Sequence, residues 1–152
     1  MLFSKRKQMV KRILIVEDEP LVAFDNETMV AEAGYQVVAT VDSHIGAVER
    51  LDEELRAAET DDDRGVDLVL SDLSLAGDGT GLDVARAARE RGIPVMFVTA
   101  NPPTEADQVA IGCLKKPFSE RQLKAALKAA EAMLSGGKVQ PQQGLTLYGP
   151  PA

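Results

Sequence analysis

Acidic side chains follow two of the apolar runs in this sequence, at the points where those runs end. Glu17 and Asp18 come directly after RILIV (12–16), and Asp72 follows DLVLS (67–71). A carboxylate at the end of a buried strand is costly unless another group pairs with it or uses it. Carboxylates that meet at one place repel one another, and Mg²⁺ relieves that repulsion because it prefers hard oxygen ligands. The pattern therefore indicates a Mg²⁺ site.

A hydroxyl and an ammonium group follow two further apolar runs. Thr99 ends PVMFVT, and Lys116 follows AIGCLK. Lysine can neutralise one phosphoryl oxygen and threonine can hydrogen-bond another, while a carboxylate is a nucleophile that can form an aspartyl-phosphate. Asp72 follows the central strand, whereas Glu17 and Asp18 are adjacent and resemble a metal-binding pair. We therefore predict that Asp72 accepts a phosphoryl group.

Taken singly, each of these residues has an ordinary structural explanation. An aspartate after a strand is commonly a turn or cap residue, and the acidic segment at 17–19 could be the first turn of a helix. Thr99 could be a strand-end hydroxyl, and Lys116 could belong to a solvated lysine pair. The functional interpretation depends on all of these groups following the right strands in one chain.

The elements that must position these groups alternate along the chain. Helices are expected between the strands, with Pro20 in a first turn, Ser43 as a cap, and a capping box formed by Ser119 and Gln122. This alternation predicts a parallel sheet with helices on both faces, whose sites form beyond the carboxyl ends of the strands. Five short runs rich in Val and Ile predict the strands, at 12–16, 36–40, 67–71, 94–99 and 110–115.

Composition narrows the class of protein. The chain has 152 residues, of which 45% are hydrophobic, and a net charge of −7, which argues against nucleic-acid binding. The single cysteine, Cys113, suits a reducing compartment. No apolar run approaches the roughly 20 residues of a membrane span, and no signal peptide is evident. We therefore expect a cytoplasmic protein with neither membrane nor nucleic-acid partners.

Three segments differ in composition. Residues 1–10 form a basic N-terminal extension, 11–134 carry the alternating pattern, and 135–152 are rich in Gly, Pro and Gln. The last segment is expected to be a flexible tail. Its apolar residues Leu145, Leu147 and Tyr148 leave open that part of it docks on the domain.

The segments ILIVEDE, LVLSDLSL, MFVTA and LKKPFS, in this order, resemble the receiver domain of bacterial two-component response regulators over residues 11–134. The resemblance implies a flavodoxin-like, doubly wound (βα)5 fold with a five-stranded parallel sheet of order 2-1-3-4-5. It also implies a cis bond before Pro117. The site residues that it implies are Asp72 as phosphoacceptor, Thr99 as switch hydroxyl, Lys116 as active-site lysine, and Glu17, Asp18, Asp72 and the backbone carbonyl of Ser74 as Mg²⁺ ligands.

The sequence departs from the usual receiver pattern at several positions. Cys113 stands where receivers usually carry an aromatic switch residue, and Ala76 stands where proline is common. The loop at 75–81 looks longer, whereas the span from Thr99 to Lys116 is shorter and contains two prolines at 102–103. Because proline cannot sit inside a helix, the fourth helix is expected to be short, at 104–109. This variant pattern resembles single-domain receivers of alphaproteobacteria.

These features predict a single-domain response regulator, a monomer or weak dimer, in a two-component phosphorelay. Asp72 would accept a phosphoryl group from a sensor histidine kinase, or from a histidine phosphotransfer protein, and later lose it to water without being a turnover enzyme. Because the 18 residues after Leu134 are too few for an effector domain, the output would be a contact with a downstream protein or drainage of phosphate. One alternative is a phosphorylation-independent interaction module. Another, an aspartate-nucleophile phosphatase, would need a second acid where Ser74 stands.

Overall fold

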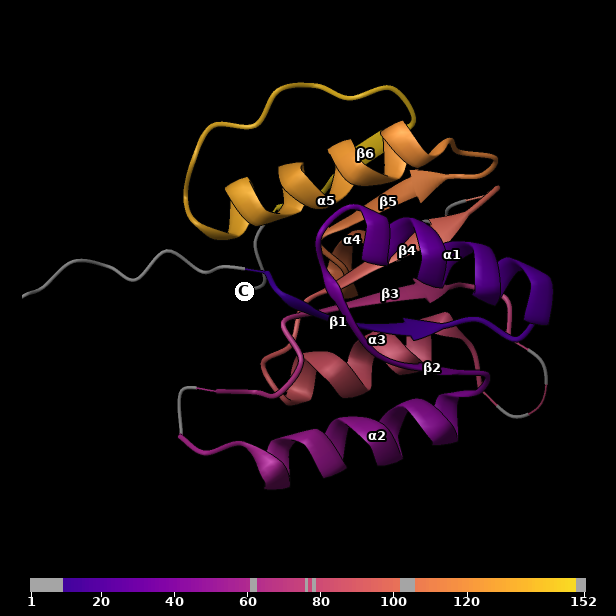
Figure 1. The fold of residues 1–152 in the computed structure, drawn as a ribbon, viewed down its shortest axis with the longest axis vertical. Coiled ribbons are helices and arrows are strands. Elements are labelled where there is room, and N and C mark those ends of the chain that lie inside the picture. The colour runs from indigo at the N-terminus through magenta and orange to yellow at the C-terminus, as the bar shows by residue number, and fades with distance from the viewer. Residues whose placement is uncertain (1–9, 61–62, 76, 78, 102–105, 150–152) are drawn as a thin grey trace, which may run out of the picture.

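The computed structural model describes residues 10–60, 63–75, 77, 79–101 and 106–149. This part of the chain forms one sheet with helices on both faces (Figure 1). The strands are β1 (Arg12–Val16), β2 (Gln36–Val41), β3 (Leu68–Asp72), β4 (Val95–Thr99), β5 (Gly112–Lys115) and β6 (Leu145–Leu147). The helices are α1 (Pro20–Glu32), α2 (His44–Ala57), α3 (Gly81–Glu90), α4 (Ala106–Val109) and α5 (Glu120–Leu134).

The sheet has the order β2-β1-β3-β4-β5-β6. The first five strands are parallel, as predicted, and the order within them is the predicted 2-1-3-4-5. β6 is antiparallel to β5 and lies at the outer edge. The predicted five-stranded parallel sheet is therefore present and has one further strand, because Leu145–Leu147, in the segment expected to be a flexible tail, docks on β5.

Both faces of the sheet are buried, which explains the near-continuous apolar runs. Successive strand residues point to opposite faces. One buried cluster therefore contains Ile13 and Leu70 and packs under α1 and α5, and the other contains Leu14 and Phe97 and packs under α2 and α3. Figure 1 shows these helix pairs on either side of the sheet.

The helix boundaries follow local signals in the sequence. Pro20 occupies the first turn of α1, and Gly34 follows that helix with φ of 99°. The Ser43 side chain accepts a hydrogen bond from the Gly46 amide at the start of α2, and Ser119 forms the predicted capping box with Gln122. No helix in the described part of the chain is long and apolar enough to cross a membrane.

The fourth helix is short, as predicted, over the residues that the structure describes. α4 has four residues and ends at Val109, as expected, while the expected start at 104–105 and the two prolines lie outside the described residues. The basic extension lies outside them as well, except for Val10. That residue is buried, and its amide donates to Glu131 Oε2 at 3.0 Å, so Val10 packs with the domain.

Candidate functional site

The acidic residues singled out in the sequence meet at the carboxyl ends of β1 and β3. Glu17 and Asp18 follow β1, and Asp72 is the last residue of β3 rather than the residue after it. One carboxylate oxygen from each of the three lies within 4.8 Å of the others. β1 and β3 are neighbours in the parallel sheet, so their carboxyl ends must lie side by side.

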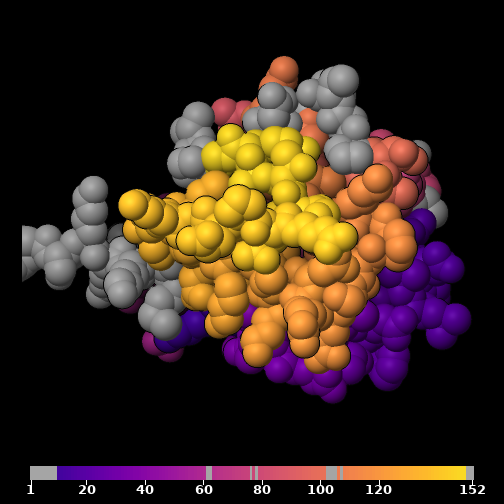
Figure 2. Space-filling model, turned by 90° about the horizontal axis from the view of Figure 1, so that it is seen from above, coloured from indigo at the N-terminus to yellow at the C-terminus, as the bar shows by residue number. Residues whose placement is uncertain are grey.

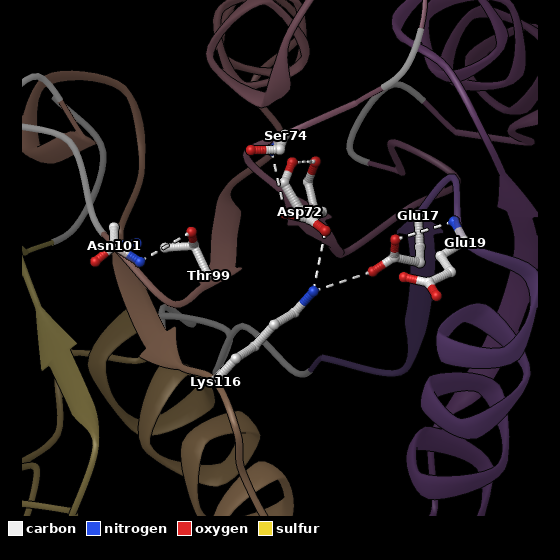
Figure 3. A network of polar contacts seen from close by, with 8 residues as sticks. Glu17, Glu19, Asp72, Ser74, Thr99, Asn101 and Lys116 are labelled. Atoms are coloured by element: carbon white, nitrogen blue, oxygen red, sulfur yellow. Dashed lines mark hydrogen bonds and ion pairs between the residues drawn. The ribbon is translucent and has the colours of Figure 1, made fainter.

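Lys116 joins two of these carboxylates. Its Nζ lies 3.0 Å from Asp72 Oδ2 and 3.2 Å from Glu17 Oε1. Figure 3 shows the lysine side chain rising from the segment after β5 to a point between the two acids. The side chain of Glu17 is only 2% exposed and that of Asp72 13%, so the ion pairs are shielded from solvent and are screened less than surface pairs.

Burial and charge shift the pKa values in this cluster. Burial raises the pKa of Glu17 above its ordinary value, and the Glu19 amide and the Lys116 charge oppose this only in part. Burial lowers the pKa of Lys116, but the hydrogen bond to Asp72 and the charges of Asp72 and Glu17 more than offset it, so its pKa is raised. The Lys116 ammonium group thus pairs with two of the three carboxylates, those of Glu17 and Asp72.

The loop after β3 holds Asp72 by its backbone. The Ser74 amide donates to Asp72 Oδ1 at 3.1 Å, so the amide of Ser74 is the group that contacts the acid. Gly81, which begins α3, packs against this loop, and its amide donates to the Leu73 carbonyl at 2.9 Å. A Cβ on Gly81 would lie 2.2 Å from the Asp72 carbonyl oxygen, so only glycine allows this close approach.

Thr99 lies on the other side of Lys116 from Glu17 (Figure 3). Its side-chain oxygen accepts a hydrogen bond from the Asn101 amide at 3.3 Å, and the Lys116 amide donates to its carbonyl at 3.0 Å. An open cavity of about 480 Å³ lies above these residues. Its lining includes Asp72, Ser74, Thr99, Asn101 and Lys116.

The structure thus brings all the predicted side chains together at the carboxyl ends of the parallel strands. Sequence reasoning missed Gly81 and the backbone of Asn101, which position the loop and the hydroxyl. A glycine at the first position of a helix was the available signal for Gly81. The Lys116–Pro117 bond is cis, as the resemblance implied, and Cys113 is buried in β5. Ala76 lies outside the described residues.

The donor set fits a divalent cation. Glu17, Asp18 and Asp72 offer converging carboxylate oxygen atoms, which are the hard ligands that such a cation prefers. Mg²⁺ takes one or two carboxylates together with water and phosphate oxygens, in keeping with a site beside an open cavity. Burial raises the pKa of Glu17 because it disfavours the charged carboxylate, and a bound cation would stabilise that charged form.

The chain resembles known proteins in both sequence and structure. The family described as response regulator receiver domain matches residues 13–128. The phyllosphere-induced regulator PhyR of Methylorubrum extorquens is 32% identical over 127 residues, which are 80% of this chain and 44% of that protein. The chain therefore spans less than half the length of this curated relative.

Two solved structures show the same fold. SdrG from Pseudomonas melonis, in its BeF3-activated conformation, is 30% identical with a TM-score of 0.64, over 81% of this chain and 98% of that one. The anti-anti-sigma factor PhyR from Bartonella quintana is 27% identical with a TM-score of 0.60, over 83% of this chain and 48% of that one. The match to SdrG spans nearly all of that protein.

Proposed function

Because the chain belongs to the response regulator receiver domain family, we propose that it is a phosphoryl-accepting switch of a two-component phosphorelay. Asp72 is the proposed acceptor, and the donor is a phosphohistidine on a sensor histidine kinase or a histidine phosphotransfer protein. The observation that carries this proposal is the contact of Lys116 with Asp72 at the rim of an open cavity. The Asp72 carboxylate, the Lys116 ammonium group and free space for a phosphoryl group then lie together.

The proposed transfer uses groups that the fold already holds in place. A carboxylate oxygen of Asp72 attacks phosphorus, an O–P bond forms, and the N–P bond to the donor histidine breaks, so that the imidazole leaves with the electron pair. Lys116 stabilises negative charge on the phosphoryl oxygens, and Thr99 can donate to one of them because its hydroxyl lines the same cavity. Water later cleaves the acyl phosphate.

Glu17, Asp18 and Asp72 would hold Mg²⁺, with the Ser74 carbonyl as a further proposed ligand. Bound there, the ion neutralises phosphoryl charge during transfer. Without the metal the three converging carboxylates repel the charge of a phosphoryl group, so we expect this chain to bind that group only weakly.

The proposal concerns the receiver chemistry and not the activity of longer relatives. The anti-anti-sigma factor matched in Bartonella quintana is about twice as long as the matched region, so its output is not transferred to this chain. We propose instead that the receiver unit, at residues 11–134, acts through contact with a protein partner or by draining phosphate from a shared kinase.

Phosphorylation by a small-molecule donor tests the chemistry without requiring the kinase. The full chain is incubated with phosphoramidate and Mg²⁺, and intact mass is measured. We expect the wild type to gain one phosphoryl group and Asp72→Asn to gain none. Asp25→Asn, at an exposed position on α1, is the matched control and should behave as the wild type. Phosphorylation of Asp72→Asn to the wild-type level would overturn the assignment.

A further inference from the structure

The outer edge of β5 is closed by a strand from the far end of the chain. β6 (Leu145–Leu147) pairs antiparallel with β5, and the backbone bonds continue at both ends of the pair. The Lys115 amide donates to the Gly144 carbonyl, and the Tyr148 amide donates to the Ile111 carbonyl, both at 2.8 Å. Figure 2 shows the C-terminal segment, in yellow, lying across the surface beside the orange region that contains α5.

A glycine at the start of β5 makes this pairing possible. Gly112 has no positive φ, so its own backbone does not demand glycine. A Cβ at this position would lie 2.8 Å from the Thr146 carbonyl oxygen and 2.9 Å from Leu147 Cδ2, both of which belong to β6. Glycine weakens a strand and commonly marks the close approach of another backbone. The requirement for glycine at position 112 therefore comes from the strand that docks there.

The side chains of β6 use both faces of the sheet. Leu145 and Leu147 pack against the buried cluster that includes Leu114 and Leu123, on the side of α5. Tyr148 packs against the cluster on the opposite face. Thr146, between the two leucines, is exposed. We call this surface, formed by the edge of β5 and the apolar cluster beside Leu114, the β5 seat.

The strand in the β5 seat is attached more weakly than the strands of the core. β6 has three residues, pairs with one neighbour in the described sheet, and buries its leucines only partly, whereas β1 is buried along almost its whole length. Residues 138–142, which lead to it, form no helix or strand. Short edge segments with few buried contacts open locally without global unfolding.

We propose that the β5 seat is a strand-binding site, which β6 occupies in this structure and which a segment of another protein takes when β6 is displaced. The occupant seen here defines the chemistry of that partner. It is an extended segment, antiparallel to β5, with leucine-like side chains two residues apart that face α5. Such strand addition draws affinity from backbone hydrogen bonds and specificity from alternate side chains. The proposal is independent of phosphorylation at Asp72.

A second copy of this chain is a poorer occupant than a different protein. A tethered strand competes at an effective concentration of order millimolar. The same strand from a second copy has no better contacts with which to overcome that advantage. A partner with a longer strand, or with contacts outside the seat, can do so.

The test measures whether the seat accepts a strand in trans. The full chain with Leu145→Asp and Leu147→Asp keeps the seat but disables its own strand. A labelled synthetic peptide of residues 142–149, QQGLTLYG, is titrated against it, and binding is followed by fluorescence anisotropy. We expect saturable binding, and binding to the wild type at least about tenfold weaker because the tethered strand competes.

Matched substitutions separate strand addition from non-specific binding. Adding Gly112→Val to the open variant should abolish binding, because the new Cβ meets the incoming backbone. In the peptide, Asp at the two leucine positions should abolish binding, whereas Asp at the outward Thr146 position should leave it unchanged. Equal binding to the Gly112→Val protein, or no binding to the open variant up to millimolar peptide, would overturn the proposal.

A measurement on the wild type keeps the proposal falsifiable if the variants unfold. The Tyr148 amide, which holds β6 to β5, and the Val69 amide, which donates to the Pro94 carbonyl in the core, are compared by hydrogen exchange. We expect Tyr148 to exchange at least about a hundredfold faster, since a local opening releases it. Equal protection of the two amides would mean that β6 leaves only on global unfolding, and the seat would not be available to a partner.

Discussion

The segment that contains β5 takes part in two regions that are held together in different ways. Just after the strand, Lys116 joins Glu17 and Asp72 through charge, in a cluster with a buried acid. Along its outer edge, β5 holds β6 through backbone hydrogen bonds and two partly buried leucines. Gly112 and Lys116 are four residues apart in the sequence and serve these two separate purposes.

The difference lies in how each region responds to the loss of one group. Lys116 pairs with both Glu17 and Asp72, so its removal leaves two largely buried carboxylates without this counter-charge, which is costly. The β5 seat combines backbone hydrogen bonds with the packing of Leu145 and Leu147, so changes at the exposed position Thr146 should weaken it only slightly. Its vulnerable position is Gly112, where adding one carbon closes the space that β6 needs.

The largest effect on stability is expected from Lys116→Met, which keeps the length of the side chain and removes its charge. With Glu17 buried and Asp72 largely so, we expect a loss of about 3 kcal/mol in the free energy of unfolding at pH 7. Because burial raises the pKa of Glu17, protonation relieves the variant, and the loss should shrink as the pH falls toward the ordinary glutamate value of 4.5. Urea denaturation at several pH values measures this.

The neighbouring lysine provides the control for this prediction. Lys115 is exposed, and Lys115→Met should change stability by no more than about 0.5 kcal/mol. Mg²⁺ should restore part of the stability of Lys116→Met, since a cation replaces the missing charge. Equal losses in the two variants, or a deficit independent of pH, would show that charge balance does not hold this site together.

An intermediate effect is expected at Cys113, the sole cysteine, which lies opposite Thr146 of β6. Burial raises the pKa of this thiol from 9.0 to about 11, so at pH 8 the folded protein has roughly a hundredfold less thiolate than the unfolded chain. Gly112→Val displaces β6 and should speed the reaction with a disulfide reagent by about tenfold or more. Absorbance kinetics on the native proteins measure the change.

The raised thiol pKa also sets the sign of a stability change. A thiol that holds its proton more tightly when folded contributes stability below pH 9, and that contribution is lost as the pH rises toward about 11. Cys113→Ala should remove this part of the alkaline destabilisation. If the Cys113 thiol reacts with the disulfide reagent at equal rates in the native wild type and in native Gly112→Val, β6 does not cover it. As a control, the two proteins should react at the same rate in denaturant.

The smallest effect is expected at Gln122, which connects the start of α5 to the turn before β6. Its Oε1 accepts from the Ser119 amide at 2.8 Å, and its Nε2 donates to the Gln143 carbonyl at 3.5 Å, in the turn before β6. Gln122→Glu keeps the cap and loses the donor, so global stability should change by less than about 0.5 kcal/mol while amide exchange in β6 accelerates. Gln122→Ala loses both contacts and should cost about 1 kcal/mol. Equal costs for the two variants would contradict this division.

Much of the fold was predictable because burial on both faces of a parallel sheet leaves a strong local pattern. β1 has the predicted bounds, whereas β5 begins two residues later than predicted, at Gly112. Ala110 was assigned to that strand, but its amide donates to the Ala106 carbonyl, so it completes the turn of α4. Apolar residues at a helix end and in a buried strand look alike in sequence, and long-range contacts decide between them.

The sequence by itself determined the parallel α/β architecture and the residue types of the charged cluster. Acidic, hydroxyl and ammonium groups at the ends of four of the five predicted strands stand out, because such groups are rarely buried without a use. Tertiary structure alone decided that Lys116 spans Glu17 and Asp72, and that β6 closes the sheet beside Gly112. Pairing of an edge strand depends on the backbone of a distant segment, and the alternation over Leu145–Leu147 is too short to predict which strand it joins.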